Sequence, residues 1–235
     1  YLGARNWSRG ISGHALPDSE ISRCAGLARS CGKVLHVALN IVPGLKETGR
    51  FVEKCLYYLS LGVDGLILND FGLMANLLSA DSNAPLYASV GCGISNIADA
   101  AFYADLGVKG VVLPPGTPPR EIRDIKEKCG LEVEIFTEVL LEPFLFGKCW
   151  LGSYCSLKRR ISEDKEVFSG SARRGSCSRG CRAGWEVLRN KEMLYSRYEL
   201  AFEHFSLLDH IEAYLEAGTD LLKIQGRGAD LALIL

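Results

Sequence analysis

The stretch Gly65–Val90, GLILNDFGLMANLLSADSNAPLYASV, contains the repeating unit that decides the fold. It opens on a short, β-rich apolar run at Gly65–Leu68 and continues with apolar residues at helical spacing over Leu73–Ser79. It then returns to a second apolar run at Leu86–Val90. A strand, a helix and a second strand in this order predict parallel strands joined by a right-handed crossover, and therefore an α/β fold.

The same alternation extends over the first 140 residues of the chain. Glycine follows several of the expected helices, and Asp18 and Asn96 stand where helix N-caps are expected. The further expected strands are Tyr1–Ala4, Val34–Val42, Gly110–Leu113 and Val133–Phe136, and the further helices are Asp18–Ser30, Glu47–Leu61, Ile97–Leu106 and Pro119–Cys129.

A last helix–strand unit is expected at Leu207–Ala217 and Asp220–Ile224, which brings the expected strands to seven. Seven strands at this spacing predict a (β/α)8 TIM-type barrel that lacks one strand. Because the chain begins directly on a strand, we expect the missing first strand and helix to precede Tyr1. A doubly wound open sheet is the alternative, but GCGISN, at Gly91–Asn96, lacks the third glycine of a dinucleotide-binding loop.

The regular spacing breaks once, after the strand that ends near residue 137. We expect barrel elements at 1–137, a cysteine-rich insertion at 138–206 and the final barrel unit at 207–235, all within one domain. A connection of this length is far longer than ordinary βα loops, which indicates a functional segment. It leaves the C-terminal end of a strand, the end at which barrel enzymes carry their active sites.

Four cysteines of this insertion are spaced as two close pairs: Cys149, Cys155, Cys177 and Cys181. Four thiolates on a glycine-containing loop suit an iron–sulfur cluster or, as the alternative, zinc. The spacing is wide for zinc knuckles, which favours the cluster, and unligated surface thiols are the remaining reading. From position 148 to 182 the chain has nine basic and three acidic residues, a local charge of +6 that would offset a thiolate-bound cluster.

The composition sets few other limits. Net charge is −1 and 48% of residues are hydrophobic, which is typical of a globular protein and gives no overall attraction to nucleic acid or membrane. No apolar run is long enough to span a membrane. Nine cysteines, an odd number in a chain of this size, favour a reducing cytoplasm over a disulfide framework.

Six further residues at or near strand ends are candidates for the site. Asp70 is a candidate general base or a helix N-cap, and Glu134 is a candidate catalytic carboxylate or the partner of a buried ion pair with Lys223 or Arg227. The candidates for substrate binding are Asn40, Asn96, Lys223 and Arg227. Arg227 could clamp a carboxylate or phosphate. His36, in mid-strand, is expected to be a core histidine.

The segment RRGSCSRGCRAGWEV, at Arg173–Val187, resembles the cysteine signature of the collagenase-like peptidase family, peptidase family U-32. Three other segments resemble motifs of that family in the same order: YLGARNWSR at the start, Glu134 and Phe136 as its Glu-x-Phe, and KIQGR at Lys223–Arg227. The resemblance implies a barrel core and, as in several members, a four-cysteine [4Fe–4S] cluster.

The chain departs from the family pattern before the cysteines. Glu138 and Val139 stand where the family usually has His-Gly, and no cysteine follows until Cys149, which resembles the second cysteine of the family. Cys155 would then be a shifted fourth ligand. Cys92, at the end of the Leu86–Val90 run, is the alternative ligand if it reaches inward.

The resemblance implies two different activities. Some members are implicated in oxygen-independent hydroxylation of RNA cytidine or of a quinone precursor, with prephenate as the expected oxygen donor, whereas the family name implies proteolysis. The chain lacks the H-E-x-x-H and G-x-S-x-G motifs of hydrolases, and a cluster suits redox chemistry, so hydroxylation is favoured. Lys223 and Arg227 would meet the dianionic donor, and the basic cysteine loop would meet RNA. A non-catalytic subunit with a structural cluster, paired with a related barrel protein, is the further alternative.

Overall fold

The computed structural model describes residues 1–8, 15–141, 158–162, 165–169, 184–198, 200 and 203–226. Cys149, Cys155, Cys177, Cys181 and Arg227 lie outside the described residues. No helix in the described part of the chain has both the length and the apolar character needed to cross a membrane.

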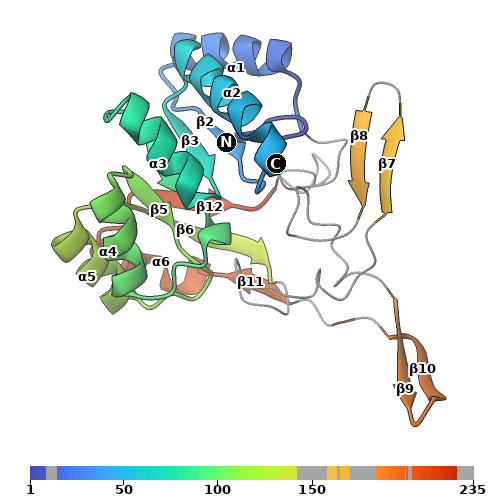
Figure 1. Cartoon of the computed structure of the whole chain (residues 1–235). Helices are drawn as coiled ribbons and strands as arrows, with labels where there is room; N and C mark the ends of the chain where they lie inside the picture. Colours follow the sequence, from blue (N-terminus) through green and yellow to red (C-terminus); the bar gives the residue numbers. More distant parts are fainter. Residues whose placement is uncertain are drawn as a thin grey trace.

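A curled sheet of seven parallel strands forms the centre of the molecule (Figure 1). The first six strands pair in the order in which they occur along the chain. The seventh, β12, follows the long insertion and pairs with β6. In spatial order the strands are β1 (Leu2–Gly3), β2 (His36–Leu39), β3 (Gly65–Leu68), β4 (Leu86–Ala88), β5 (Gly110–Val112), β6 (Glu132–Leu140) and β12 (Leu221–Ile224). The seven predicted strands are therefore present and follow the predicted order.

The curl makes a half-barrel of TIM type, because no pairing among the described residues joins β12 to β1. The two strands nevertheless approach each other through side chains. The Lys223 ammonium nitrogen, on β12, lies 3.9 Å from the ring centroid of Tyr1, the residue before β1. The predicted α/β barrel class is thus confirmed in its partial form.

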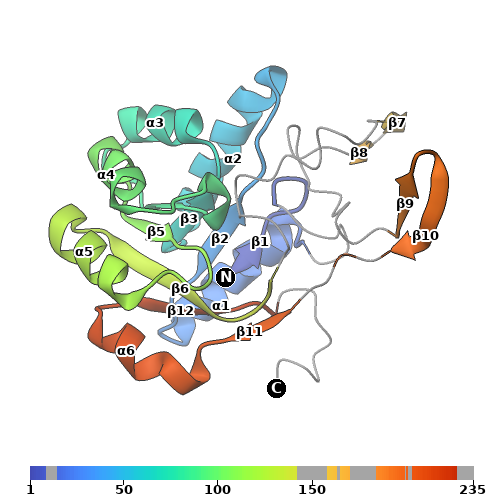
Figure 2. The ribbon, with the colours of Figure 1, turned by 90° about the horizontal axis from the view of Figure 1, so that it is seen from below.

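Helices cover the outer face of this sheet, and Figure 2 shows them arranged around the outside of the curl. The helices are α1 (Asp18–Ser30), α2 (Thr48–Ser60), α3 (Phe71–Ala80), α4 (Ile97–Leu106), α5 (Pro119–Cys129) and α6 (Ile211–Glu216), with 3₁₀ turns η1 (Leu45–Glu47), η2 (Val90–Cys92) and η5 (Leu208–His210). In α3 the helical spacing buries Leu73, Met74, Leu77 and Leu78. Each such side chain contributes about 1.5–3 kcal/mol when it is removed from water.

The alternating pattern of the strands divides the apolar residues between two cores. One face packs against the helices, with Val37, Leu66 and Val111 among its fully buried residues. The other face fills the inside of the curl, where Ala38, Ile67, Tyr87, Val112, Phe136 and Val139 form a second cluster. Parallel strands that are buried on both faces explain why the sequence shows continuous apolar runs.

The Tyr87 ring fits inside the curl because glycine stands on both neighbouring strands. A Cβ atom at Gly65 would lie 2.6 Å from the Tyr87 ring, and one at Gly110 would lie 2.8 Å from it. Atoms this close must move apart, so these two positions require glycine for close packing rather than for backbone freedom.

The predicted caps have different outcomes. Asn96 caps α4, where its side-chain oxygen accepts a hydrogen bond from the Asp99 amide. Asp18 does not cap α1, because Pro17 takes the cap position and makes no side-chain cap bond. The Asp18 carboxylate instead accepts hydrogen bonds from Lys54 and from the Tyr58 hydroxyl, which tie α1 to α2.

The strand expected to end near residue 137 continues to Leu140. It is extended by β11 (His204–Ser206), which pairs antiparallel with residues 138–140 of β6 and was not predicted. The insertion therefore leaves and re-enters the fold at one place, the C-terminal end of β6. Within it lie two antiparallel hairpins, β7 (Lys158–Ser162) with β8 (Lys165–Ser169), and β9 (Trp185–Arg189) with β10 (Glu192–Tyr198).

Candidate functional site

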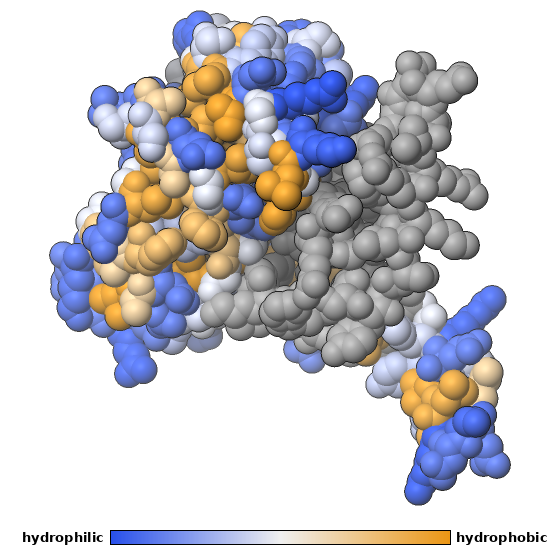
Figure 3. Space-filling view, in the orientation of Figure 1, coloured by the Kyte–Doolittle hydropathy of each residue, from blue (hydrophilic) through white to orange (hydrophobic). Residues whose placement is uncertain are grey.

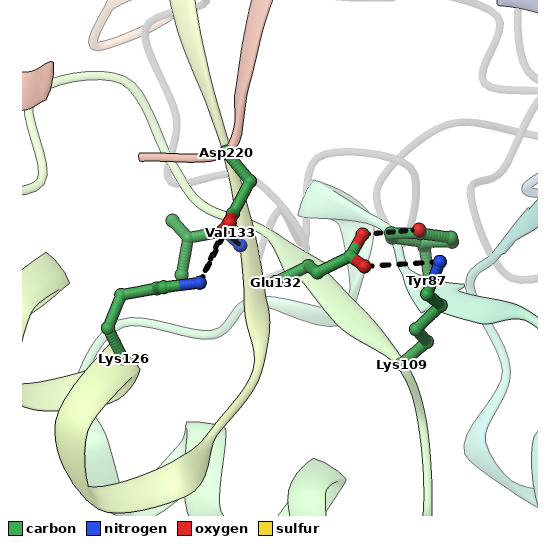
Figure 4. Close-up of polar contacts among 6 residues, drawn as sticks. All are labelled: Tyr87, Lys109, Lys126, Glu132, Val133 and Asp220. Atoms are coloured by element: carbon green, nitrogen blue, oxygen red, sulfur yellow. Dashed lines mark hydrogen bonds and ion pairs between the residues drawn. The ribbon is translucent and has the colours of Figure 1, made fainter. Parts of the chain in front are cut away.

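The two ends of the half-barrel carry different kinds of residue. At the N-terminal end, the Asp220 carboxylate accepts a 2.6 Å hydrogen bond from the Val133 amide and binds the Lys126 ammonium at 2.7 Å (Figure 4). These contacts fasten the start of β12 to β6 and to α5. All three groups are occupied with one another, so the contacts stabilise the fold.

A second set of contacts lies at the same end. The Tyr87 hydroxyl donates a 2.6 Å hydrogen bond to Glu132, whose other oxygen lies 3.1 Å from the Lys109 ammonium (Figure 4). Burial and the bond to Glu132 both raise the pKa of the Tyr87 hydroxyl, which therefore stays protonated as a donor. This end of the curl is closed by structural pairs, and the candidate site lies at the opposite end.

Polar residues gather at the C-terminal ends of the strands, the edge where α/β barrels place their sites. Asn40 follows β2, Asn69 and Asp70 follow β3, and Ser89 follows β4. The Asn69 side-chain oxygen is buried, and no described residue donates a hydrogen bond to it. Asn69 was not among the candidates from sequence, although its place directly after the apolar run LIL marks it as a strand-end residue.

Asp70 and Asn96 both cap helices in the structure. The Asp70 carboxylate accepts a 3.0 Å hydrogen bond from the Leu73 amide at the start of α3. Asn96 caps α4, and its side-chain amide also donates to the Asp99 carboxylate at 3.2 Å. Capping explains why these residues stand there, and a role for either in chemistry or binding stays a prediction.

The buried ion pair predicted for Glu134 is present, and Lys223 is the partner. Both residues are in the interior, with 5% of Glu134 and 8% of Lys223 exposed. The Lys223 ammonium lies 3.9 Å from the centroid of the Tyr1 ring and 5.6 Å from that of the Phe136 ring. Pairing and aromatic contacts compensate the charge, so a carboxylate ligand would meet a neutralised pair at this position.

His36 lies in the same interior and packs against Tyr87, with the ring centroids 4.5 Å apart. Burial lowers the pKa of His36, and the nearby Glu134 carboxylate only partly opposes this effect. The imidazole is therefore neutral at neutral pH. His36 is buried, as predicted for a core histidine.

Cys92, the alternative cluster ligand, is described by the structure, whereas the four cysteines of the insertion are not. It belongs to η2, directly after β4, and packs against the core between the sheet and the helices. Its thiol donates to the Leu68 carbonyl oxygen at 3.6 Å, and burial raises its pKa to about 12. The thiol is thus partly buried and neutral in this structure, and its role as a ligand stays a prediction.

Within the described part of the chain, no group of three or more potential ligands is arranged to hold a metal ion. The four cysteines of the insertion flank described hairpins. Cys155 precedes Lys158 by three positions and Cys177 follows Ser169 by eight, and these two hairpin residues are cross-strand partners. The hairpin therefore shortens the connection between the two cysteines from 22 chain positions to eleven.

A serine, a carboxylate and a histidine meet where β11 pairs with β6. The Ser206 hydroxyl donates to one Glu138 oxygen, and His204 lies 3.0 Å from the other. The carboxylate stands in the centre, so the histidine does not contact the serine. A hydrolytic triad requires the histidine in the central place to take the proton of the serine, and this cluster does not provide it.

The fold and the polar strand ends define a partial (β/α)-barrel protein with a candidate site at the C-terminal ends of its strands. The model of peptidase family U32 matches residues 1–232, and the chain belongs to this family. The solved structure of the U32 peptidase Mk0906 has the same fold, with a TM-score of 0.52 and 16% identity over 62% of this chain and 63% of that one.

Curated relatives cover most of this chain. The tRNA hydroxylation protein P of Escherichia coli is 25% identical over 82% of this chain and 40% of its own length, and the tRNA hydroxylation protein P1 of Bacillus subtilis is 24% identical over 97% and 53%. An uncharacterized protease of Methanocaldococcus jannaschii is 26% identical over 85% of this chain and 48% of its own length. The chain thus spans about half the length of these relatives.

Proposed function

We propose that this chain is the barrel portion of an enzyme that hydroxylates a base of RNA without molecular oxygen, with cytidine as the first candidate. The observation that carries the proposal is the alignment of nearly the whole chain with proteins named for RNA hydroxylation. One of them, the 23S rRNA 5-hydroxycytidine C2501 synthase of Escherichia coli, is 26% identical over 92% of this chain. Because the chain spans about half the length of the curated relatives named above, the activity is proposed for the whole protein.

The second part of the proposal is a [4Fe–4S] cluster held by Cys149, Cys155, Cys177 and Cys181. The β7–β8 hairpin supports it, because pairing of Lys158 with Ser169 shortens the connection between two of the cysteines. The contacts of Cys92 also favour Cys155 as the fourth ligand, because the Cys92 thiol donates to the Leu68 carbonyl and packs against the core on the helix side of the sheet. Such a cluster, when bound, supplies one-electron transfer.

The oxygen donor is proposed to be a small hydroxylated carboxylate such as prephenate. The base exchanges a C–H bond for a C–OH bond, so the donor must exchange its C–OH bond for C–H and accept the two electrons that the base loses. Arg227 is the first partner to test for the carboxylates of the donor, because the cation of Lys223 is already paired. Gln225 accepts a hydrogen bond from the Leu140 amide, which fixes the end of β12 two positions before Arg227.

The residues after β3 are proposed to meet the base. The Asn69 oxygen is a buried acceptor without a described donor, and the amino group of cytosine is a donor that would satisfy it. Asp70, the next residue, is the proposed general base, and Asn40 and Asn96 are proposed substrate contacts from the neighbouring strand ends. Glu134 stays a candidate for proton transfer through its place beside Lys223 in the interior.

The experiment is to produce the full-length protein anaerobically in a host that lacks its own RNA-hydroxylating relatives. Nucleosides of tRNA and 23S rRNA are then analysed by mass spectrometry for the addition of one oxygen atom. We expect the wild-type protein and Cys31→Ala, which removes an exposed thiol, to form the product. Cys177→Ala and Cys155→Ala should lose both the product and the bound iron.

Iron-loaded wild-type protein that hydroxylates neither RNA would refute the proposed reaction. Zinc in place of iron would refute the cluster, and cleavage of gelatin by the metal-free protein would favour a peptidase. Constant co-purification with a related barrel protein, together with product only in its presence, would assign this chain to a heteromeric complex.

A further inference from the structure

The β9–β10 hairpin extends away from the half-barrel (Figures 1 and 2). Its two strands are joined by Asn190 and Lys191, which both have left-handed backbones, with φ of 52° and 70°. Two left-handed residues form the tight turn that matches the twist of a hairpin, so the strands are well defined. A two-stranded hairpin is nevertheless only marginally stable in water by itself.

Most large apolar residues of this hairpin are exposed. Figure 3 shows an apolar patch on this hairpin, bordered by hydrophilic residues. The exposed fractions are 56% for Leu188, 54% for Met193, 51% for Leu194, 60% for Tyr195 and 47% for Tyr198. Exposed apolar patches that are rimmed by polar residues are typical of interaction surfaces.

The strand register places the aromatic residues on one face. Tyr195 is the cross-strand partner of Val187, and Tyr198 is the partner of Trp185, so their side chains project from the same side. The ring centroids of Tyr195 and Tyr198 lie 6.0 Å apart, and the ring planes make an angle of 52°. Because the two ring planes are tilted relative to each other, their faces point in different directions. The aliphatic pair Leu188 and Met193 belongs to the opposite face.

The same two strands and their turn also carry charged residues. Arg189 and Lys191 stand at the tip of the hairpin, and Arg197 stands between the two tyrosines at an irregular position with φ of 58°. Glu186 and Glu192 are the acidic residues, so residues 184–198 carry a net charge of +1. All five charged residues are exposed. The hairpin begins four positions after Cys181, at the end of a segment with a charge of +6.

We propose that the β9–β10 hairpin binds an unpaired segment of RNA, with one base on each of Tyr195 and Tyr198 and with phosphates at Arg189, Lys191 and Arg197. This inference rests on the proposed function, which makes RNA the substrate. Exposed aromatic rings between cations are typical of surfaces that bind single strands, because every base has a face that can stack. Duplex RNA keeps its bases stacked on one another and offers none to the two rings.

The hairpin follows the cysteine segment and belongs to the insertion that leaves and re-enters at the C-terminal end of β6. An RNA strand held by it would therefore be tethered on the same side of the barrel as the candidate site. The inferred role is to hold the nucleotides that flank the target base.

The test measures binding of a fluorescent, unstructured oligoribonucleotide to the full-length protein, with a duplex RNA of equal length for comparison. The variant is Tyr195→Ala with Tyr198→Ala. We expect it to weaken single-strand binding at least about fivefold for each ring and to leave duplex binding unchanged. The matched control, Leu188→Ala with Met193→Ala, changes the other face of the same hairpin and should bind RNA like the wild type.

A second variant separates charge from stacking. Replacing Arg189, Lys191 and Arg197 by glutamine should lower the salt dependence of binding, whereas the tyrosine variant should keep the wild-type salt slope. Equal RNA affinity of the wild type and the tyrosine variant would overturn the inference. A change of oligomeric state in the tyrosine variant, measured by light scattering, would overturn it in favour of a protein interface.

Failure of the hairpin inference can be distinguished from failure of the proposed function. RNA that is hydroxylated normally and bound normally by the tyrosine variant overturns only the role of the hairpin. Loss of RNA binding in this variant, with no hydroxylated nucleoside in the wild type, would leave the hairpin as an RNA-binding element and refute the proposed reaction.

Discussion

Removing one member of the Glu134–Lys223 pair should be far more costly than removing both. The two side chains are 5% and 8% exposed, so Glu134→Leu leaves an ammonium in the interior and Lys223→Met leaves a carboxylate there. Each single substitution should lower the free energy of unfolding by about 3–5 kcal/mol. This is a large share of the roughly 5–15 kcal/mol that stabilises a typical domain.

The double variant, Glu134→Leu with Lys223→Met, leaves no buried charge. Its remaining cost includes the lost contacts of the Lys223 ammonium with the Tyr1 and Phe136 rings, of which the closer, at 3.9 Å, is worth about 1–2 kcal/mol. Urea unfolding followed by far-ultraviolet circular dichroism should therefore find the double variant more stable than either single variant. Costs that simply add in the double variant would refute the claim that the two residues act as a pair.

The folded double variant also separates structure from chemistry. Hydroxylated nucleoside formed at the wild-type level would assign the pair a structural role. A stable double variant that binds RNA normally and forms no product would place Glu134 or Lys223 in the reaction.

Three further predictions concern stability and can be checked by urea unfolding. Gly110→Ala should lower the free energy of unfolding by about 1–3 kcal/mol because its methyl group would meet a buried tyrosine ring. Gly26→Ala, in an open helical position, should raise it by about 0.5–1 kcal/mol, and equal effects of the two variants would contradict the close packing at Gly110. The pKa of His36 is lowered in the fold, so the unfolded chain binds the proton more readily, and the free energy of unfolding should fall as the pH drops below about 6.5. His36→Gln should flatten this decline, and an unchanged pH profile in the variant would contradict the role of His36. Asp220→Asn should lower the free energy of unfolding by about 1–3 kcal/mol because this carboxylate binds the buried Val133 amide and the Lys126 ammonium. Asp124→Asn breaks only an exposed ion pair within a helix and should cost under about 0.5 kcal/mol, and similar costs of the two variants would contradict the role of Asp220 in anchoring β12.

Local patterns predicted most elements closely. The helices at Asp18–Ser30, Ile97–Leu106 and Pro119–Cys129 have the expected bounds, because a glycine or a change of backbone direction ends each one within a few residues. The hairpins of the insertion were not predicted. The residues of the β9–β10 hairpin are mostly exposed, so no buried face imposes a regular alternation of apolar and polar residues along its strands.

The candidate site was predicted less evenly. The need for a cationic partner of Glu134 followed from the cost of burying a lone carboxylate, with Lys223 and Arg227 as candidates, and the structure shows that Lys223 is the partner. The direction of the Cys92 thiol could not be predicted, because the turn after β4 decides whether its side chain points to the helices or to the interior. The buried Asn69 oxygen could not be found from sequence either, since its lack of a donor depends on residues distant in the chain.

The sequence by itself determined the order of strands and helices, the parallel sheet and membership of the family, because these follow from apolar spacing, helix-ending residues and short motifs along the chain. Only the tertiary structure decided which charged side chains neutralise one another, which end of the half-barrel is closed by structural pairs, and which apolar residues stay exposed on the β9–β10 hairpin. Those properties depend on the distances between groups that lie far apart in the sequence, such as the 2.7 Å between Lys126 and Asp220, and local patterns carry no information about such distances.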